Sequence, residues 1–437
     1  MLAYHLRIAA KSLRRTPILS ALLVVGIALG IAVSTAFVAA YHTVAKDPIP
    51  HKSDRLFWVA MDGWNKERPW DDDHPKDPPD QLTYRDAMAL MASPIPTHKN
   101  AMFKSQLTVF PASREERPFR ARTRVTFRDF FSLFDTPFEY GGAWGAEADA
   151  GPQPVVVLSH DANQKLFGGA NSVGKQVRIE DRQFTVSGVL APWRPKPTFY
   201  DPLNGAFEES EEIFIPFRWT PVMEIDTAGN RSSWKSFGNE YADLLESESI
   251  WIQYWVQLDD AKQKEAYLSW LAGYVGEQKK VGRFERPLNN RLYSVREFLD
   301  WQSVVPRPAK TMLVISLLFL VVSSVNLIGI LLGKFLARSS EVGVRRALGA
   351  TQGAIFRQFL VEAGVVGLAG GLVGLALSVA ALALIAQQSK SLAVVAQMDW
   401  PMLGLTFVLA IAAALLAGLL PTWRATKVTP ALQLKSQ

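Results

Sequence analysis

Four long apolar runs dominate the hydrophobic pattern of the chain. They are Ile18–Tyr41, Thr311–Gly333, Phe359–Ala386 and Pro401–Leu420. Each reaches the length of about 20 apolar residues that spans the hydrocarbon core of a membrane. The region between the first and second runs has no such stretch and is polar and rich in tryptophan. We therefore predict four transmembrane α-helices, with a large extracytoplasmic domain between the first and the second.

Shorter periodicities within that domain indicate both strands and helices. Lys175–Leu190 alternates apolar and polar residues on either side of a central Asp-Arg pair, which predicts a hairpin. Ser249–Leu258 is apolar at every even position and mixed at the odd ones, which predicts another strand. Gln81–Met91 and Ala261–Gln278 have helical spacing, and Asp259 and Asp260 are possible caps of the second of these helices. The large domain is therefore predicted to be α+β.

The connection between the second and third apolar runs has a helical pattern of its own. The second helix is expected to continue past Gly333 into the cytosol as LLGKFLARSSEV (Leu331–Val342), and the chain should break at Gly349-Ala350. Thr351 can cap a new short helix whose apolar residues recur at helical spacing. A short helix held between two spanning helices moves when they move. This segment is therefore suited to transfer force between the membrane and a cytosolic partner.

The distribution of charge predicts the orientation of the chain. The 437 residues are 49% hydrophobic and carry a net charge of +6. The segments before the first apolar run, between the second and third, and after the fourth together hold twelve basic residues and two acids. Because basic residues near helix ends stay cytoplasmic during insertion, both termini should be cytoplasmic and 43–310 should lie outside. The first run is too long for a signal-peptide core, so we expect it to remain as an anchor.

Three features of the large domain suggest ligand chemistry. Gly169–Gln176 nearly matches a phosphate-binding loop, but Gln176 stands where a hydroxyl would hold Mg²⁺, so we exclude a nucleotide site. The acidic segment 71–80 could bind a hard cation, although its prolines favour a solvated loop, and both interpretations stay open. Trp251 and Trp255 could form an apolar ligand surface, although core packing is the more common role of large aromatic residues.

The sequence contains no recognisable catalytic centre. It has no cysteine, and its six histidines show no paired spacing for a metal ion. It also has no nucleophile-elbow motif. We therefore expect neither a catalytic nor a metal site, and no cofactor bound by this chain.

Several segments resemble one family of membrane proteins. EVGVRRALGATQGAIFRQFLVEA, with Asn326 upstream, resembles the cytoplasmic coupling segment of the MacB and FtsX type of ABC transporter permease. Leu6–Ala32 is similar to the amphipathic N-terminal helix and first span of that family, and Val155–Leu190 to the hallmark of its periplasmic core domain. Leu419–Leu434 fits the ending of the family. The resemblance covers most of the chain except roughly 203–306, whose role stays open.

On this resemblance the chain divides into nine parts. They are an amphipathic N-terminal helix (1–17), a first transmembrane helix (18–42), a periplasmic core domain (43–310), a second transmembrane helix with a cytoplasmic extension (311–337), a coupling segment (338–358), a third transmembrane helix (359–386), a short periplasmic loop (387–399), a fourth transmembrane helix (400–420) and a cytoplasmic tail (421–437).

The resemblance implies a permease dimer in the bacterial inner membrane. The dimer would consist of two copies of this chain, or of this chain and a related paralogue. It would bind cytosolic ABC ATPase subunits, which hold ATP and Mg²⁺. In that family the coupling segment relays the motion of the ATPase to the periplasmic domain. This domain then moves an amphiphile, drug or peptide toward an exit duct or carrier. A periplasmic adaptor and an outer-membrane duct are further candidate partners. The ATPase is expected to be a separate chain, because the sequence contains no ATPase domain.

Two other functions stay open at this point. A lipoprotein-releasing permease has the same plan of four helices and would bind acylated peptide. A regulator of the FtsX kind would not transport, and would activate a periplasmic partner such as a cell-wall hydrolase.

The resemblance also places two groups of residues. The residues expected to contact the ATPase are Glu341, Arg345, Arg346, Leu348, Gly349, Ala350 and Thr351. Alternatively, the arginines only anchor lipid headgroups. Charge reversal at Arg345 and Arg346 is expected to uncouple hydrolysis from transport. Small or polar residues expected to pack transmembrane helices together are Gly26, Gly30, Asn326, Gly367, Gly371 and Gly374.

Overall fold

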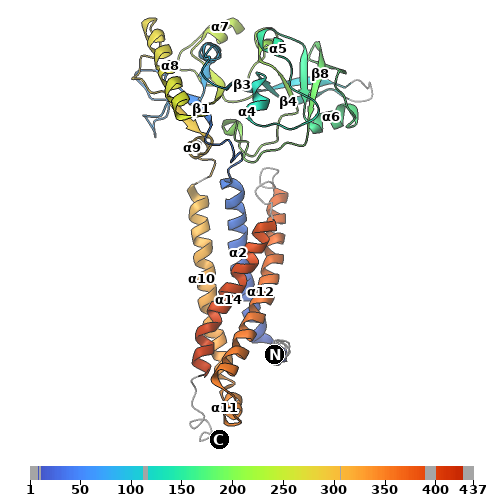
Figure 1. The fold of residues 1–437 in the computed structure, drawn as a ribbon, viewed down its shortest axis with the longest axis vertical. Coiled ribbons are helices and arrows are strands. Elements are labelled where there is room, and N and C mark those ends of the chain that lie inside the picture. The colour runs from blue at the N-terminus through green and yellow to red at the C-terminus, as the bar shows by residue number, and fades with distance from the viewer. Residues whose placement is uncertain (1–7, 9–10, 112–116, 306, 389–399, 427–437) are drawn as a thin grey trace. The chain divides into compact units, whose positions relative to one another are not determined.

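The computed structural model describes residue 8 and residues 11–111, 117–305, 307–388 and 400–426. They form two compact units, which we treat separately (Figure 1). The helical unit comprises Met1–Lys46 and Val305–Gln437, and the globular unit comprises Asp47–Val304. Most of the predicted N-terminal helix 1–17, of the loop 387–399 and of the tail 421–437 lies outside the described residues.

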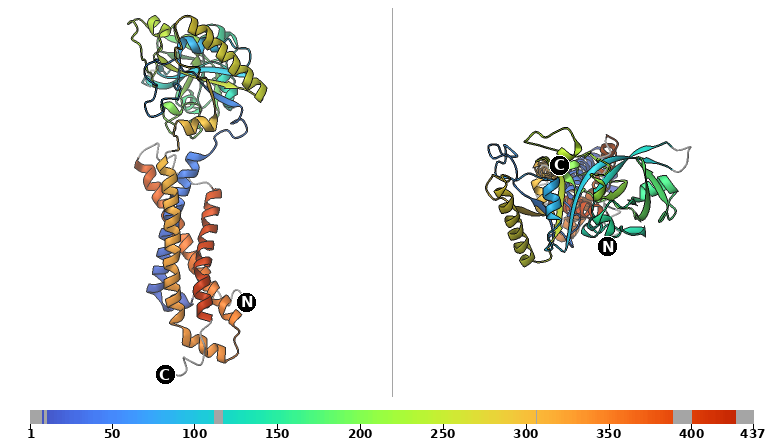
Figure 2. Two further views of the ribbon diagram at one scale, coloured as in Figure 1. Left: turned by 90° about the vertical axis from the view of Figure 1, so that its left-hand side faces the viewer. Right: turned by 90° about the horizontal axis from the view of Figure 1, so that it is seen from above.

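The described part of the helical unit contains four long helices and a short one, with a further helical turn at 11–15. Their bounds are α2 (Pro17–Ala45), α10 (Arg307–Leu336), α11 (Ser339–Ala347), α12 (Gln352–Gln388) and α14 (Trp400–Thr426). The long helices run side by side (Figure 2). Within the described residues, α2, α10 and α12 contain candidate membrane spans by length and hydropathy, at Pro17–Ala39, Lys310–Leu336 and Gln352–Leu384. The fourth predicted span coincides with α14 and stays a prediction.

The connection between α10 and α12 differs from the prediction. α10 ends at Leu336, and the short helix is α11, which precedes the break. The helix after the break is not short, because it continues into the third span for 37 residues. Since 352–388 contains no proline, nothing in that stretch removes a hydrogen bond from the helical ladder.

The globular unit contains one mixed sheet with helices on its faces. Its strands are β1 (Leu56–Ala60), β2 (Leu82–Thr83), β3 (His98–Phe110), β4 (Phe119–Thr126), β5 (Phe138–Gly141), β6 (Val155–Leu158), β7 (Gln176–Ile179), β8 (Arg182–Leu190), β9 (Ile213–Pro216), β10 (Ile250–Gln257) and β11 (Arg291–Ser294). Its helices are α3 (Tyr84–Leu90), α4 (Asp129–Leu133), α5 (Glu147–Ala150), α6 (His160–Phe167), α7 (Tyr241–Glu246), α8 (Ala261–Lys280) and α9 (Val295–Trp301), with short 3₁₀ turns at Pro202–Asn204 and Phe217–Trp219.

The order of the sheet is β11-β1-β10-β3-β4-β9-β6-β8-β5, with β2 paired to β10 and β7 paired to β3 and β8. The pairs β4–β9 and β6–β8 are parallel, and the other strand pairs are antiparallel. The predicted hairpin is confirmed as β7 and β8, with Ile179 opposite Arg182. Helices α3 and α8 and strand β10 are also confirmed, and the amide of Gln263 donates to the predicted cap Asp260 at 2.7 Å. The domain is therefore α+β.

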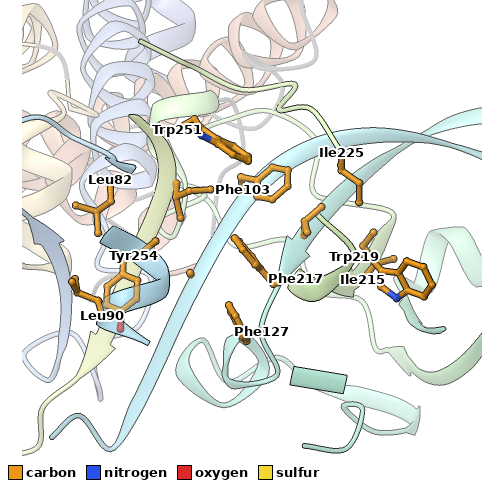
Figure 3. Packing of buried hydrophobic residues seen from close by; sticks show 14 of the residues in the cluster. Leu82, Leu90, Phe103, Phe127, Ile215, Phe217, Trp219, Ile225, Trp251 and Tyr254 are labelled. Carbon is orange, nitrogen blue, oxygen red and sulfur yellow. The ribbon is translucent and has the colours of Figure 1, made fainter. Parts of the chain in front are cut away.

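Two hydrophobic clusters lie on opposite faces of the sheet. One contains Phe103, Phe217 and Trp251 together with residues of α3 and α8 (Figure 3). The other contains Trp58, Trp255 and residues of α4 and α9. Because β10 lies between the two clusters, all eight of its residues are buried, and the mixed face predicted from its odd positions is wrong. Trp251 and Trp255 are 1% and 0% exposed, so they are core residues rather than a ligand surface.

A charged network is enclosed in the core of the globular unit. Arg124 of β4 is 1% exposed and donates hydrogen bonds to Glu211, to Asp201 at 2.7 Å and to Gln253 of β10 at 2.9 Å. The hydroxyl of Tyr200 donates to Glu211 at 2.6 Å. Burial alone would raise the pKa of Glu211, but the Arg124 charge and the Tyr200 hydroxyl hold it below its usual value. The network therefore ties the segment around 200–211 to the centre of the sheet.

Candidate functional site

The short helix α11 is closed at its C-terminal end by a glycine. Gly349 has a φ of +96°, in the left-handed region that favours glycine. The amides of Gly349 and Ala350 donate to the carbonyls of Arg346 and Arg345 at 3.1 and 3.0 Å. These two bonds form the Schellman arrangement that ends many helices. The break predicted at Gly349-Ala350 is therefore confirmed.

One side of α11 is fixed to its neighbours by a cap and by apolar packing. The amide of Ala354 donates to Thr351 Oγ1 at 3.2 Å, which confirms Thr351 as the cap of α12. Phe359 of α12 stacks on Phe335 of α10 with ring centroids 4.3 Å apart. Val342 of α11 is buried in the same hydrophobic cluster. The three helices α10, α11 and α12 therefore share a small core.

The other side of α11 exposes apolar side chains. Val344 is 55% exposed, and Leu348, directly after the helix, is 83% exposed. Residues four positions apart lie on the same helical face. These two exposed apolar side chains make this side of α11 a candidate contact surface. Leu348 was among the predicted residues, but Val344 was missed because its sequence context resembles that of the buried Val342.

The predicted charged residues have neighbours within the chain. Arg345 donates to Glu341 at 2.6 Å, one helical turn earlier, and to Gln358 of α12 at 2.8 Å. Arg346 is half-buried and also has an interaction of its own. The Arg345 charge therefore braces α11 against α12, in addition to any contact with another molecule.

Two of the predicted packing glycines lie where helices approach closely. A methyl group at Gly30 of α2 would come within 3.0 Å of Ser323 in α10. A methyl group at Gly374 of α12 would come within 2.8 Å of the Ala28 carbonyl in α2. Of the other predicted glycines, two are buried and one is exposed with open space around it: Gly367, Gly371 and Gly26.

Asn326 lies on the exposed surface of α10. We expected this polar side chain to face protein, and the described part of this chain does not cover it. An uncharged polar group is costly to leave against lipid, so a position of this kind usually faces another protein surface or water.

The globular unit has an open groove of about 720 Å³. Its lining includes Trp64, Trp234, Phe237 and Arg283. Trp234 and Phe237 are 36% and 40% exposed, so these aromatic residues, and not Trp251 or Trp255, meet solvent. Sequence patterns missed them because the segment around them is irregular and has no periodicity.

Arg283 is a charged residue of the groove lining. It donates to Asp86 at 2.8 Å and to Glu248 at 2.8 Å. Burial alone would lower the pKa of Arg283, but the hydrogen bonds that it donates to Glu248 and Asp86 raise it, so the side chain stays charged. Arg283 is therefore paired with both carboxylates, which makes it a structural brace in the groove lining.

Two carboxylates of the acidic segment 71–80, those of Asp71 and Asp77, have separate partners. His74 Nδ1 and Asp71 are 2.9 Å apart, while Asp77 accepts from Arg291 at 2.8 Å and from Trp301 at 3.0 Å. Among the described residues, no three histidine or carboxylate side chains converge as a metal site would require.

Comparisons with known proteins agree with this architecture. Residues 20–272 match the model of the MacB-like periplasmic core domain, and residues 313–430 match the model of the FtsX-like permease C-terminal domain. The chain belongs to the MacB and FtsX family of ABC transporter permeases. The resemblance drawn from the coupling segment and from Val155–Leu190 is therefore confirmed, and this permease is a multi-pass membrane protein.

Named relatives of the permease are export proteins. The pyoverdine export ATP-binding/permease protein PvdT of Pseudomonas aeruginosa is 26% identical over 311 residues, which cover 71% of this chain and 41% of PvdT. The macrolide export ATP-binding/permease protein MacB of Azoarcus sp. is 27% identical over 307 residues, which cover 69% and 40%. The permease thus spans about two fifths of the length of these relatives. Among solved structures, the periplasmic region of MacB from Actinobacillus actinomycetemcomitans matches 56% of this chain and 92% of its own, at 13% identity and a TM-score of 0.36.

Proposed function

We propose that this permease relays the motion of a separate cytosolic ABC ATPase to its globular unit, which exports an amphiphile, drug or peptide from the periplasmic side of the bacterial inner membrane. In this arrangement both chain termini and α11 are cytoplasmic. ATP and Mg²⁺ are held by the partner ATPase, and this chain contributes no catalytic residue.

The surface of α11 carries this proposal. It combines a firmly held inner side, through Val342, with an exposed apolar outer side at Val344 and Leu348. A rigid helix with protruding apolar residues is suited to dock into a groove of a partner protein. Glu341, Arg345 and Arg346 would surround this contact, with Gly349, Ala350 and Thr351 setting its shape.

A second permease subunit is also part of the proposal. The exposed Asn326 supports it, because a neighbouring subunit seated on α10 would remove this polar side chain from lipid. Close packing at Gly30 and Gly374 would keep each four-helix set rigid within such a dimer.

The groove beside Trp234 and Phe237 is the part of the globular unit that we assign to contact with substrate.

A single exposed leucine tests the docking of the ATPase. The permease carries an affinity tag and is expressed with candidate ABC ATPases of the same genome. Leu348→Asp should lower the amount of co-purified ATPase at least about tenfold, because a central apolar anchor is worth more than about 1.4 kcal/mol. Leu288→Asp is the matched control, since Leu288 is a 56% exposed leucine of the globular unit. Equal recovery of ATPase with both variants would contradict the proposal.

A further inference from the structure

A buried carboxylate joins three segments of the helical unit. The side chain of Glu362, in α12, is 1% exposed. Lys334 Nζ, in the last turn of α10, lies 2.9 Å from Glu362 Oε1, and an Arg338 guanidinium nitrogen lies 3.2 Å from Oε2. The hydroxyl of Ser12 also donates to Oε1, and Lys334 donates to Ser20 of α2 at 3.3 Å. We call these five residues the Glu362 cluster.

Each contact of Glu362 leads to a different part of the chain. Ser12 belongs to the helical turn at 11–15 that precedes α2. Lys334 belongs to α10, and Arg338 is the residue from which α11 starts. One anion thus holds two cations and a hydroxyl in a nearly dry environment, where removal of the anion would leave charges uncompensated. The cluster is therefore placed where the coupling segment meets the rest of the helical unit.

Sequence patterns gave no indication of this cluster. Lys334, Arg338 and Glu362 were counted only as charges at membrane ends. Ser12 and Glu362 are 350 residues apart in sequence, so no local spacing connects them. Their meeting depends on how the helices pack.

We propose that Glu362 is a positioning residue for the coupling segment. Through its ion pair with Arg338, Glu362 holds the start of α11 against α12. Because Glu362 is itself a residue of α12, any displacement of α11 is passed to α12. Gly374 brings α12 against α2, and α2 ends at Ala45, directly before the globular unit begins at Asp47. The relay of motion rests on the proposed function, whereas the holding of α11 does not.

Two substitutions separate positioning from a general role in folding. Arg338→Met and Lys334→Met each remove one cation, and each leaves Glu362 paired with the other. The cluster therefore has the same net charge in both variants, but only Arg338→Met removes the link to α11. If the cluster served folding alone, removal of Lys334, whose side chain is 1% exposed against 17% for Arg338, would loosen α11 at least as much as removal of Arg338.

A cysteine reporter reads the position of α11 directly. The chain has no cysteine, and Val342 of α11 is 5% exposed. In the full chain in nanodiscs, Arg338→Met should speed maleimide labelling of Val342→Cys at least about tenfold by favouring local opening, and Lys334→Met should change it less than about twofold. Arg338→Lys should restore slow labelling. If Arg338→Met does not yield folded protein, Arg338→Gln takes its place.

The outcomes also separate this inference from the proposed function, because the labelling needs no ATPase. Equal labelling rates in the Arg338 and Lys334 variants would overturn the positioning role, whether or not an ATPase binds. Fast labelling confined to the Arg338 variant supports the positioning role. That result would stand even if no ATPase were ever recovered with the permease.

Discussion

Single polar and charged residues show most clearly which contacts can be predicted from the sequence and which cannot. Asp260 and Thr351 were predicted as helix caps and are caps, because a cap depends only on residues within one turn. Arg124 and Glu362 gave no local signal, because each is bound by partners from distant segments. The exposed position of Asn326 could not be predicted either, because the apolar run around it does not indicate which face of the helix is covered.

Asp80 predicts a dependence of stability on pH. Its Oδ1 is sealed from solvent with no hydrogen-bond partner among the described residues, and burial raises its pKa from 3.8 to about 6. The folded domain therefore binds this proton more tightly than the unfolded chain. The stability that this group contributes is complete below pH 3.8 and is lost as the pH rises to about 6.

Asp80→Asn should consequently stabilise the globular unit at pH 7.5 by up to about 3 kcal/mol and have little effect at pH 3.5. The measurement is urea unfolding of 47–304, which contains both of its own hydrophobic clusters. Asp181→Asn is the control, because the Asp181 side chain is 79% exposed. A stability difference that is the same at both pH values would contradict this explanation.

At the scale of elements, periodicity was a good guide where one face of an element is buried. The β7–β8 hairpin, α3 and α8 were predicted correctly for that reason. Strand β10 was predicted with one buried and one mixed face, but it is central and buried on both faces. The short helix was placed after Gly349 instead of before it, because the polar residues of α11 obscured its pattern, whereas the glycine signalled the break itself.

Helix α10 carries a prediction of its own. Asn326→Cys in this cysteine-free chain should form a disulfide between two permease copies when membranes are oxidised with copper phenanthroline, because a second subunit is expected to cover Asn326. Leu331→Cys should remain monomeric, since Leu331 is 0% exposed against its own chain. The absence of a cross-linked dimer for Asn326→Cys would argue against a partner subunit on this face.

At the scale of the whole molecule, the account rests on two units with separate tasks. The globular unit has its own sheet, two cores and a groove edged by Trp234 and Phe237. The helical unit exposes Val344 on α11 and Leu348 directly after it. The family and the α+β domain could be predicted from the sequence, because both depend on extended patterns. The surface that we propose for substrate contact could not, because it lies on irregular segments.

The central claim is that α11 docks a cytosolic ATPase and does not simply rest on lipid headgroups. The most direct measurement places a photoreactive maleimide on Leu348→Cys and irradiates membranes that contain the permease and its ATPase. The account predicts a covalent adduct between permease and ATPase, and none when the label is on Leu288→Cys. Adducts of Leu348→Cys with lipid alone, while the ATPase is present, would contradict it.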